Sequence, residues 1–328
     1  MSNDMMPHFE LYQPDTLEGA LELSQRLGPT AWILAGGNDS LDWFKDRVKR
    51  PSAVIEIVGI QGLAGIEETP YGLEIGALTT LADIESQPLI REQYSLLALA
   101  AQSVASPQLR NASTIGGNLC QDTRCWYYRS GLDCYRAGGT TCYANTPLGQ
   151  DREHCLYGAS RCVAVSVADL ATASVALDAE MVIRRPDGER VVRAGDFFVG
   201  PATDITRMTV VKPGEILTVI RYPKRWAGAK FYFEKVTDRA VWDFALVSVA
   251  AALTVVAGVI EDARIVCGGI ECVPRRLEAV EQLVIGSRQT EELATLAGQT
   301  AVQGAVTLNR NDFKVPLMAN LVRRALRA

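Results

Sequence analysis

Short hydrophobic blocks, separated by glycine, proline and polar residues, run through the first half of the chain and predict alternating helices and strands. The segment Asp15-Thr16-Leu17-Glu18 can cap a helix that continues to about Leu27, where Gly28 ends it. Compact blocks of aliphatic residues that stop at such breaks are typical of buried strands. The other elements predicted here are strands at 30–35, 54–58 and 73–77 and helices at 81–84 and 94–104.

The second half contains the longest apolar stretch of the chain, Phe244 to Ile260. Its 17 residues fall below the roughly 20 residues of a membrane-spanning helix. The stretch is rich in β-branched residues and Gly258 interrupts it, so we predict a hairpin of two buried strands over 244–272. Pro223 marks the expected boundary of a C-terminal domain. The remaining elements predicted are a strand pair at 180–192, strands at 216–222 and 230–235, and helices at 276–285, 291–303 and 316–327.

The composition is that of an ordinary globular protein and excludes disordered and collagen-like chains. Of 328 residues, 48% are hydrophobic and 22% are charged, and 33 Lys and Arg face 38 Asp and Glu. A net charge of −5 argues against a protein that coats nucleic acid or an anionic membrane. The N-terminal residues lack the pattern of a secretory leader, so we expect a cytoplasmic protein without a membrane span. With only His8 and His154, a multi-histidine metal centre is impossible.

The cysteines are concentrated in one aperiodic segment. Six of the eight lie between residues 120 and 162, in a stretch rich in glycine, arginine and aromatic residues. Disulfides are disfavoured in the cytoplasm, which leaves an iron–sulfur cluster, a structural zinc ion or unligated thiols. Spacing alone does not choose four ligands from six. Five arginines of this segment could offset the charge of a bound cluster or could form a solvated basic surface: Arg124, Arg129, Arg136, Arg152 and Arg161.

Two Gly-Gly-Asn motifs precede this segment, at 36–38 and 116–118. Paired glycines let the backbone turn sharply and present successive N–H groups, as in diphosphate cradles. Neither motif is the G-x-G-x-x-G fingerprint of nicotinamide-binding domains. A single motif of this kind is equally compatible with a plain tight turn. Two such motifs in one region favour a nucleotide-containing cofactor. The sequence also offers no Ser/His/Asp or Cys/His set that would indicate catalysis by side chains.

Three motifs, taken in order, resemble one known family. Ala35–Asn38, Ser113–Asn118 and Val167–Ala171 are similar to segments of the FAD-binding medium subunit of the xanthine dehydrogenase (molybdenum hydroxylase) family. The resemblance covers nearly the whole chain, and Thr-Ile-Gly-Gly-Asn is its most specific element. The cysteine segment, which starts at Asn118, resembles the β subunit of 4-hydroxybenzoyl-CoA reductase, a branch that carries an additional [4Fe–4S] cluster.

The resemblance implies that the cofactor is FAD and that the first glycine motif wraps its diphosphate. It also implies that Val104 and Ser113–Asn118 form the second wall of the diphosphate cradle. Asp169 would bind the cofactor through its side chain, and Leu217 and Lys235 would lie near the isoalloxazine. Asn38 stands where relatives often have threonine. The implied FAD-binding residues are Ile33, Leu34, Ala35, Gly36, Gly37, Asn38, Asp39, Ser40, Val104, Ser113, Thr114, Ile115, Gly116, Gly117, Asn118, Asp169, Leu217 and Lys235.

The same resemblance assigns the cluster ligands from both ends of the segment. The start Asp-Thr-Arg-Cys matches Cys125, and the cysteine seven residues before Asp169 is Cys162. Between them lie Cys134 and Cys142. Cys120 and Cys155 then become spectators, with Cys155 as the alternative fourth ligand.

The implied fold is α+β. A two-part FAD-binding domain, with a small βαβ lobe and a mixed α/β lobe, is expected over residues 1–224 and includes an iron–sulfur loop at 119–163. A C-terminal domain of antiparallel sheet plus helices is expected over 225–328.

The implied function is electron transfer in a heteromeric molybdenum enzyme. Its partners would be a small [2Fe–2S] subunit, a large molybdopterin subunit and an external electron carrier such as ferredoxin, in a dimer of heterotrimers. The alternatives are a stand-alone flavin oxidoreductase with a zinc site and a non-catalytic metal-binding scaffold.

Overall fold

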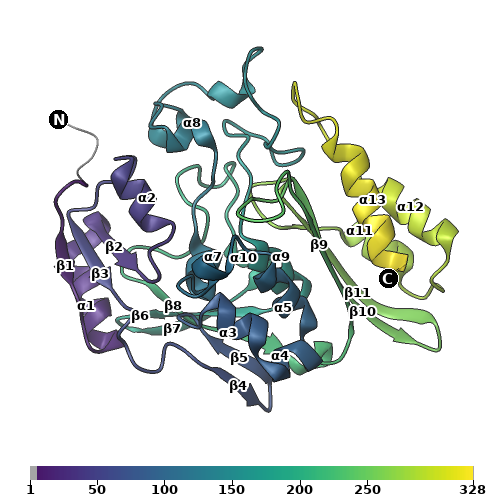
Figure 1. The fold of residues 1–328 in the computed structure, drawn as a ribbon, viewed down its shortest axis with the longest axis horizontal. Helices are drawn as coiled ribbons and strands as arrows, with labels where there is room; N and C mark the ends of the chain where they lie inside the picture. Colours follow the sequence, from purple (N-terminus) through teal and green to yellow (C-terminus); the bar gives the residue numbers. More distant parts are fainter. Residues whose placement is uncertain (1–5, 328) are drawn as a thin grey trace.

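A computed structural model describes residues 6–327 and arranges them around three β-sheets (Figure 1). Two sheets belong to the N-terminal two thirds of the chain and the third belongs to the C-terminal part. The cysteine-rich segment lies above them, at the top of Figure 1, between the N-terminal lobe and the C-terminal helices. None of the helices described is long and apolar enough to cross a membrane.

The N-terminal lobe is the expected small βαβ unit. Its parallel sheet has the order β1-β3-β2, formed by Glu10–Tyr12, Ala53–Glu56 and Ala31–Leu34. Helix α1 (Leu17–Leu27) begins where the Thr16 hydroxyl accepts a hydrogen bond from the Gly19 N–H, and its buried face packs on the sheet. The short helix α2 (Ser40–Lys45), which the sequence pattern does not predict, follows the first glycine motif directly.

The second lobe is built on a five-stranded antiparallel sheet of order β4-β5-β8-β6-β7. Helices pack together with this sheet around the largest hydrophobic core of the molecule. The strands are Ile66–Thr69 (β4), Gly72–Gly76 (β5), Glu180–Arg185 (β6), Gly188–Arg193 (β7) and Ile216–Pro223 (β8). The helices are Leu81–Ser86 (α3), Pro88–Gln93 (α4), Ser95–Gln102 (α5), Pro107–Arg110 (α6), Ile115–Cys120 (α7), Asp169–Ala176 (α9) and Ala194–Phe197 (α10).

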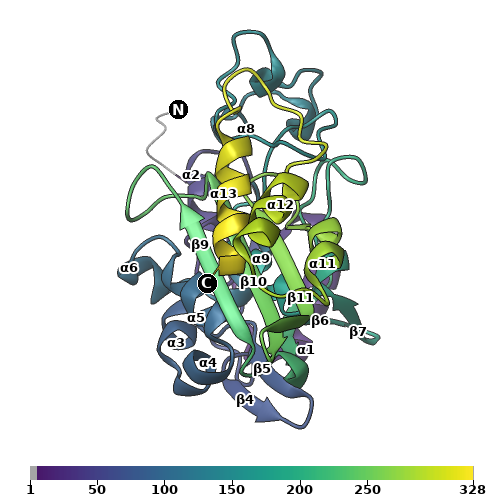
Figure 2. The same cartoon turned by 90° about the vertical axis from the view of Figure 1, so that its right-hand side faces the viewer.

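The C-terminal part forms the expected antiparallel sheet with helices on one face (Figure 2). The order is β12-β11-β10-β9, from Arg275–Arg276, Val259–Gly268, Val247–Val256 and Lys230–Val236. Helices Glu278–Val284 (α11), Glu291–Ala301 (α12) and Lys314–Arg327 (α13) cover one face, and α5 and α9 of the second lobe lie against the other.

The predicted hairpin over 244–272 is confirmed, because β10 and β11 pair along their length. Along β10, Val249, Ala251 and Leu253 pack in the core under the C-terminal helices, whereas Ala250 and Ala252 pack in the core of the second lobe. Successive side chains of a strand point to opposite faces. Both faces are buried here, and this explains why the stretch is continuously apolar instead of alternating.

The cysteine segment folds as an extended loop with short helical turns instead of regular elements. It contains α8 (Trp126–Arg129) and two 3₁₀ turns, Tyr135–Ala137 and Tyr143–Asn145. Apolar side chains of the segment are buried, including Tyr128, Ala144 and Leu156. The loop is therefore better packed than its glycine-rich composition suggests.

Candidate cofactor sites

The first glycine motif lies against residues 109–113, the turn that leads into the second motif. A Cβ atom at Gly36 would lie 1.8 Å from the carbonyl oxygen of Ala112, so only glycine permits this approach. Asn38 then joins the motifs, because its Nδ2 donates to the Ser113 hydroxyl at 2.7 Å and to the Leu109 carbonyl at 3.1 Å. Asparagine thus acts here as a cross-link between the two walls of the implied cradle.

The two motifs use their backbone N–H groups differently. Within the described residues, the N–H groups of Gly36 and Gly37 donate to no protein acceptor, and Gly37 has a left-handed φ of 76°. The second motif is not a turn but the start of helix α7, capped by the Thr114 hydroxyl. There Gly116 donates its N–H to the Ala77 carbonyl at 2.8 Å, and Gly117 donates to Thr114. The first motif is therefore the one with backbone donors available for a diphosphate.

A buried ion pair continues this site toward the C-terminal sheet. The Nζ atom of Lys235 in β9 donates to the Asp169 carboxylate at 2.6 Å and to the Ser103 carbonyl at 3.1 Å. Burial raises the pKa of Asp169, and the charge of Lys235 opposes that rise. The second motif is tied to the same place, since the Asn118 Oδ1 accepts a hydrogen bond from the Leu170 N–H at 3.3 Å.

The remaining residues implied by the resemblance flank these contacts. Val104 is half-buried next to Ser103 and packs against the main core. Leu217 is buried in β8, beside Thr218, whose carbonyl accepts a hydrogen bond from Ala77. The structure thus brings the first motif, the second motif, Val104 and the Asp169–Lys235 pair into one connected region, while Leu217 lies within the core behind it.

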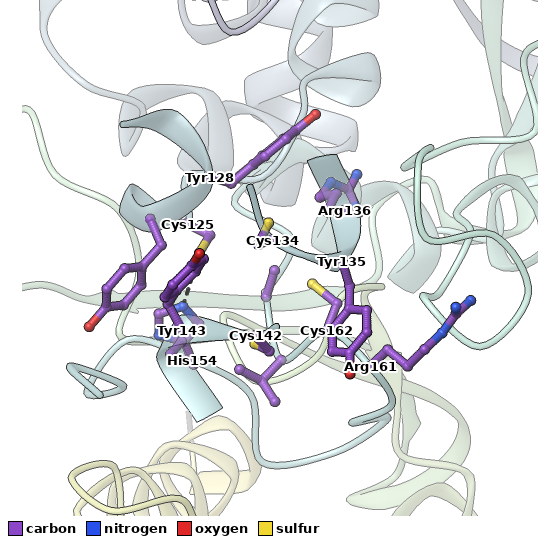
Figure 3. A pocket seen from close by; sticks show the side chains of 14 residues that line it. Cys125, Tyr128, Cys134, Tyr135, Arg136, Cys142, Tyr143, His154, Arg161 and Cys162 are labelled. Carbon is purple, nitrogen blue, oxygen red and sulfur yellow. Dashed lines mark hydrogen bonds between the residues drawn. The ribbon is translucent and has the colours of Figure 1, made fainter. Parts of the chain in front are cut away.

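Four of the six clustered cysteines line one pocket (Figure 3). Cys125, Cys134, Cys142 and Cys162 come from separate pieces of the loop and line the same small pocket, which is partly open to solvent. Cys155 is buried outside this lining. Cys120 is exposed at the end of α7. Four thiols around one space fit the donor set of a cuboidal [4Fe–4S] cluster.

Among residues 6–327, no three Cys, His, Asp or Glu side chains lie close enough together to bind one ion. Tetrahedral zinc with Zn–S bonds of about 2.3 Å requires sulfur atoms roughly 3.8 Å apart. A cuboidal cluster holds its four cysteines farther apart, because the metal–sulfide core lies between them.

His154 approaches the pocket from the end of the loop. Its Nε2 lies 3.3 Å from the Cys125 sulfur, and its Nδ1 is buried without a hydrogen-bond partner among the described residues. Burial, together with the charge of Lys314, lowers the pKa of His154 to about 4, so the imidazole is neutral near pH 7. This residue belongs to the pocket, although nothing in the local sequence around it indicates such a role.

The C-terminal domain fixes this end of the loop. Asp151 is fully buried and accepts hydrogen bonds from the Asn309 and Arg310 N–H groups at 2.9 and 2.8 Å. Lys314, at the start of α13, donates to the His154 carbonyl at 3.0 Å. Asn311 donates to the same carbonyl at 3.2 Å. These contacts replace the regular secondary structure that the loop lacks.

Asp39 connects the first glycine motif to the cysteine loop. Its carboxylate lies 2.8 Å from the guanidinium of Arg129, the last residue of α8, and 3.0 Å from that of Arg124, which precedes Cys125. The Asp122 N–H also donates to it, at 3.4 Å. The segment that carries the first cysteine is therefore anchored on the implied FAD turn.

We expect Asp39→Asn to lower the free energy of unfolding by about 1–3 kcal/mol, because it leaves two largely buried guanidinium groups without their charged acceptor. Asp42→Asn is the matched control: Asp42 is 55% exposed and its guanidinium partners are 3.9 Å away, so its loss should cost less than about 0.5 kcal/mol. Urea unfolding measures the free energy of unfolding of both variants and of the wild type. Equal losses in the two variants would contradict the anchoring role of Asp39.

Comparison with known proteins identifies the family. Residues 7–225 match the family described as the FAD binding domain in molybdopterin dehydrogenase, and residues 232–328 match the CO dehydrogenase flavoprotein C-terminal domain. The chain belongs to the FAD-binding medium subunits of the molybdenum hydroxylases. It is thus an oxidoreductase subunit, and the match to the xanthine dehydrogenase family expected from the glycine motifs is confirmed.

Relatives align with this subunit over almost its whole length. It is 36% identical over 300 residues to the aldehyde oxidoreductase FAD-binding subunit PaoB of Escherichia coli (strain K12), which covers 90% of each chain. It is 28% identical over 326 residues to the carbon monoxide dehydrogenase medium chain of Hydrogenophaga pseudoflava, covering 98% of this chain and 97% of the relative. The solved carbon monoxide dehydrogenase from that organism has the same fold, with a TM-score of 0.78 over 99% of this chain and 98% of that chain.

Proposed function

We propose that this subunit carries FAD and one [4Fe–4S] cluster and transfers electrons between an external carrier and the [2Fe–2S] and molybdenum centres of partner subunits. The observation that carries this proposal is the pocket lined by Cys125, Cys134, Cys142 and Cys162 and by neither of the two cysteines expected to be spectators. FAD would supply the exchange between two-electron and one-electron steps.

The FAD part rests on the family and on the joined glycine motifs. Residues 33–40 would surround the diphosphate through the available N–H groups, and residues 113–118 would form the opposite wall. Asp169, Lys235 and Val104 would lie along the rest of the cofactor, with Leu217 behind them. The exposed Cα of Gly117 supports this arrangement, because a side chain there would project out of α7 and meet only the Thr114 hydroxyl.

The cluster part rests on the chemistry and position of the four thiols. The finer likeness to the β subunit of 4-hydroxybenzoyl-CoA reductase belongs to the same proposal, because the ligand assignment comes from that resemblance. The chief rival is a structural zinc ion in a stand-alone flavoprotein. Both sites would use the same four thiols, so metal analysis decides between them.

The deciding experiment is an elemental and spectroscopic analysis of the complex purified without oxygen. We expect one FAD per chain and, at this site, about four iron and four sulfide. Zinc at the four cysteines with no iron would refute the cluster and favour the stand-alone flavoprotein. Absence of both flavin and metal would instead leave a scaffold without redox function.

We further expect the chain to purify with two other subunits, a small [2Fe–2S] protein and a large molybdopterin protein, as a dimer of heterotrimers. The two sites described here offer no place for a molybdenum substrate, so a complete reaction needs the partner chains. Affinity purification of the tagged chain from its native host, followed by light scattering and mass spectrometry, measures the composition. A fully active, isolated monomer would contradict this prediction.

A further inference from the structure

The arginines of the cysteine loop separate into distinct groups in the structure. Arg124 and Arg129 pair with Asp39, and Arg152 pairs with Asp238 at the surface. Only Arg136 and Arg161 line the four-cysteine pocket, and of these only Arg136 is buried, with 4% of its surface exposed. One permanent positive charge is therefore built into the wall of the pocket.

Arg136 is held rigidly in this position. It lies in a 3₁₀ turn directly after Cys134, and its two terminal nitrogens donate to the Ile205 carbonyl at 2.8 Å and to the Asp122 carboxylate at 2.7 Å. Its guanidinium also lies 5.6 Å from the centre of the Tyr128 ring. The third nitrogen, Nε, is buried and has no hydrogen-bond partner among the described residues.

The surroundings of this unpartnered N–H favour an anionic occupant of the pocket. The described lining consists of four thiols, aromatic and aliphatic side chains, His154 and two arginines, and it contains no carboxylate. A buried N–H without an acceptor is costly. A cluster bound by four thiolates is itself anionic and becomes more so when it accepts an electron, so it would benefit from the buried positive charge of Arg136.

We propose that Arg136 tunes the cluster site electrostatically: its buried guanidinium stabilises the reduced form of the cluster and so raises the midpoint potential for its one-electron reduction. This inference rests on the proposed function, because it requires a cluster at the four cysteines. Arg136 would act on the cluster through its charge and would not be one of the iron ligands. Asp122 moderates this effect, because its carboxylate lies 2.7 Å from the guanidinium and neutralises part of the positive charge.

The test is a potentiometric titration of the purified complex with dithionite, followed by the electron paramagnetic resonance signal of the reduced cluster. Arg136→Gln should lower the midpoint potential, and Arg136→Lys should restore most of the change. Asp122→Asn should shift the potential in the opposite direction, upward, because it leaves the guanidinium uncompensated. Arg161→Gln is the matched control: that charge is exposed, so its smaller shift should disappear at high salt, whereas the Arg136 shift persists.

The sign of the shifts separates tuning from a structural role. Opposite shifts in Arg136→Gln and Asp122→Asn, at unchanged iron content, support the inference. Unchanged potentials, or shifts in the same direction, overturn it while leaving the cluster assignment intact. If Arg136→Gln assembles no cluster, the potential of Asp122→Asn alone decides between the two outcomes. A wild-type complex without iron at this site overturns the proposed function itself.

Discussion

Replacing any one of the four pocket cysteines by alanine is expected to remove the cluster from this subunit. The complex should lose about four iron atoms relative to the wild type, together with one reducible signal. Cys134→Ala and Cys162→Ala are the most informative variants, because both thiols are buried in the wall of the pocket and come from well-separated parts of the loop. Alanine is preferable to serine, whose oxygen can take the place of a thiolate at iron.

The controls are the two cysteines outside the pocket. Cys120→Ala and Cys155→Ala should keep their iron, and Cys155→Ala should be the less stable of the two because its side chain is buried. Thiol acidity does not separate ligand from spectator, since burial raises the pKa of Cys125 and of Cys155 alike to about 12. Position in the pocket is the criterion.

Iron analysis of the six variants gives clear alternatives. If Cys155→Ala loses the cluster and Cys162→Ala retains it, the fourth ligand is Cys155 and the assignment is wrong at that position. If all six retain metal and that metal is zinc, the cluster proposal fails as a whole. The flavin content should be determined in the same samples, because Asp39 links the loop to the glycine turn.

The hydrophobic pattern predicted those parts of the fold whose stability is determined locally. The continuously apolar Phe244–Ile260 stretch predicted a buried hairpin. That prediction succeeded because the two faces of β10 pack in two different cores, so both had to be apolar. Helix α1 was predicted from its cap and its glycine stop, and the structure places both as expected. Helix α7 was not predicted, since Gly116 and Gly117 are poor helix formers and the helix depends on tertiary contacts with Ala77.

The loop shows where sequence reasoning ends. Its conformation depends on partners far away in the chain, such as the Asp151 carboxylate and the turn at Asn309, and no local pattern indicates such pairs. The arginines illustrate the same point: the sequence gives five equivalent candidates for charge compensation, and only folding distinguishes buried Arg136 from those paired with Asp39 or Asp238. Long-range contacts, not composition, select the functional side chains here.

Gly117→Val is expected to abolish flavin retention at a small cost in stability, because the Thr114 hydroxyl that caps α7 must shift slightly. The Gly117 Cα is exposed at the start of α7, and a Cβ atom there would meet only the Thr114 hydroxyl, at 3.0 Å. The added side chain would therefore occupy the space proposed for the cofactor. We expect FAD affinity to fall at least about tenfold, equivalent to about 1.4 kcal/mol. Absorbance of the purified complex and titration of the apoprotein with FAD measure this loss.

Two other glycines make the result specific. Gly195→Val is the neutral control, because Gly195 is also an exposed helical glycine and a Cβ atom there would contact nothing within 4 Å. Gly116→Ala is the structural control: its Cβ would lie 2.8 Å from the Ala77 carbonyl oxygen, so it should lower thermal stability with or without flavin. If Gly117→Val binds FAD as tightly as Gly195→Val does, α7 is not a wall of the cofactor site, and the diphosphate must be held by the first glycine motif alone.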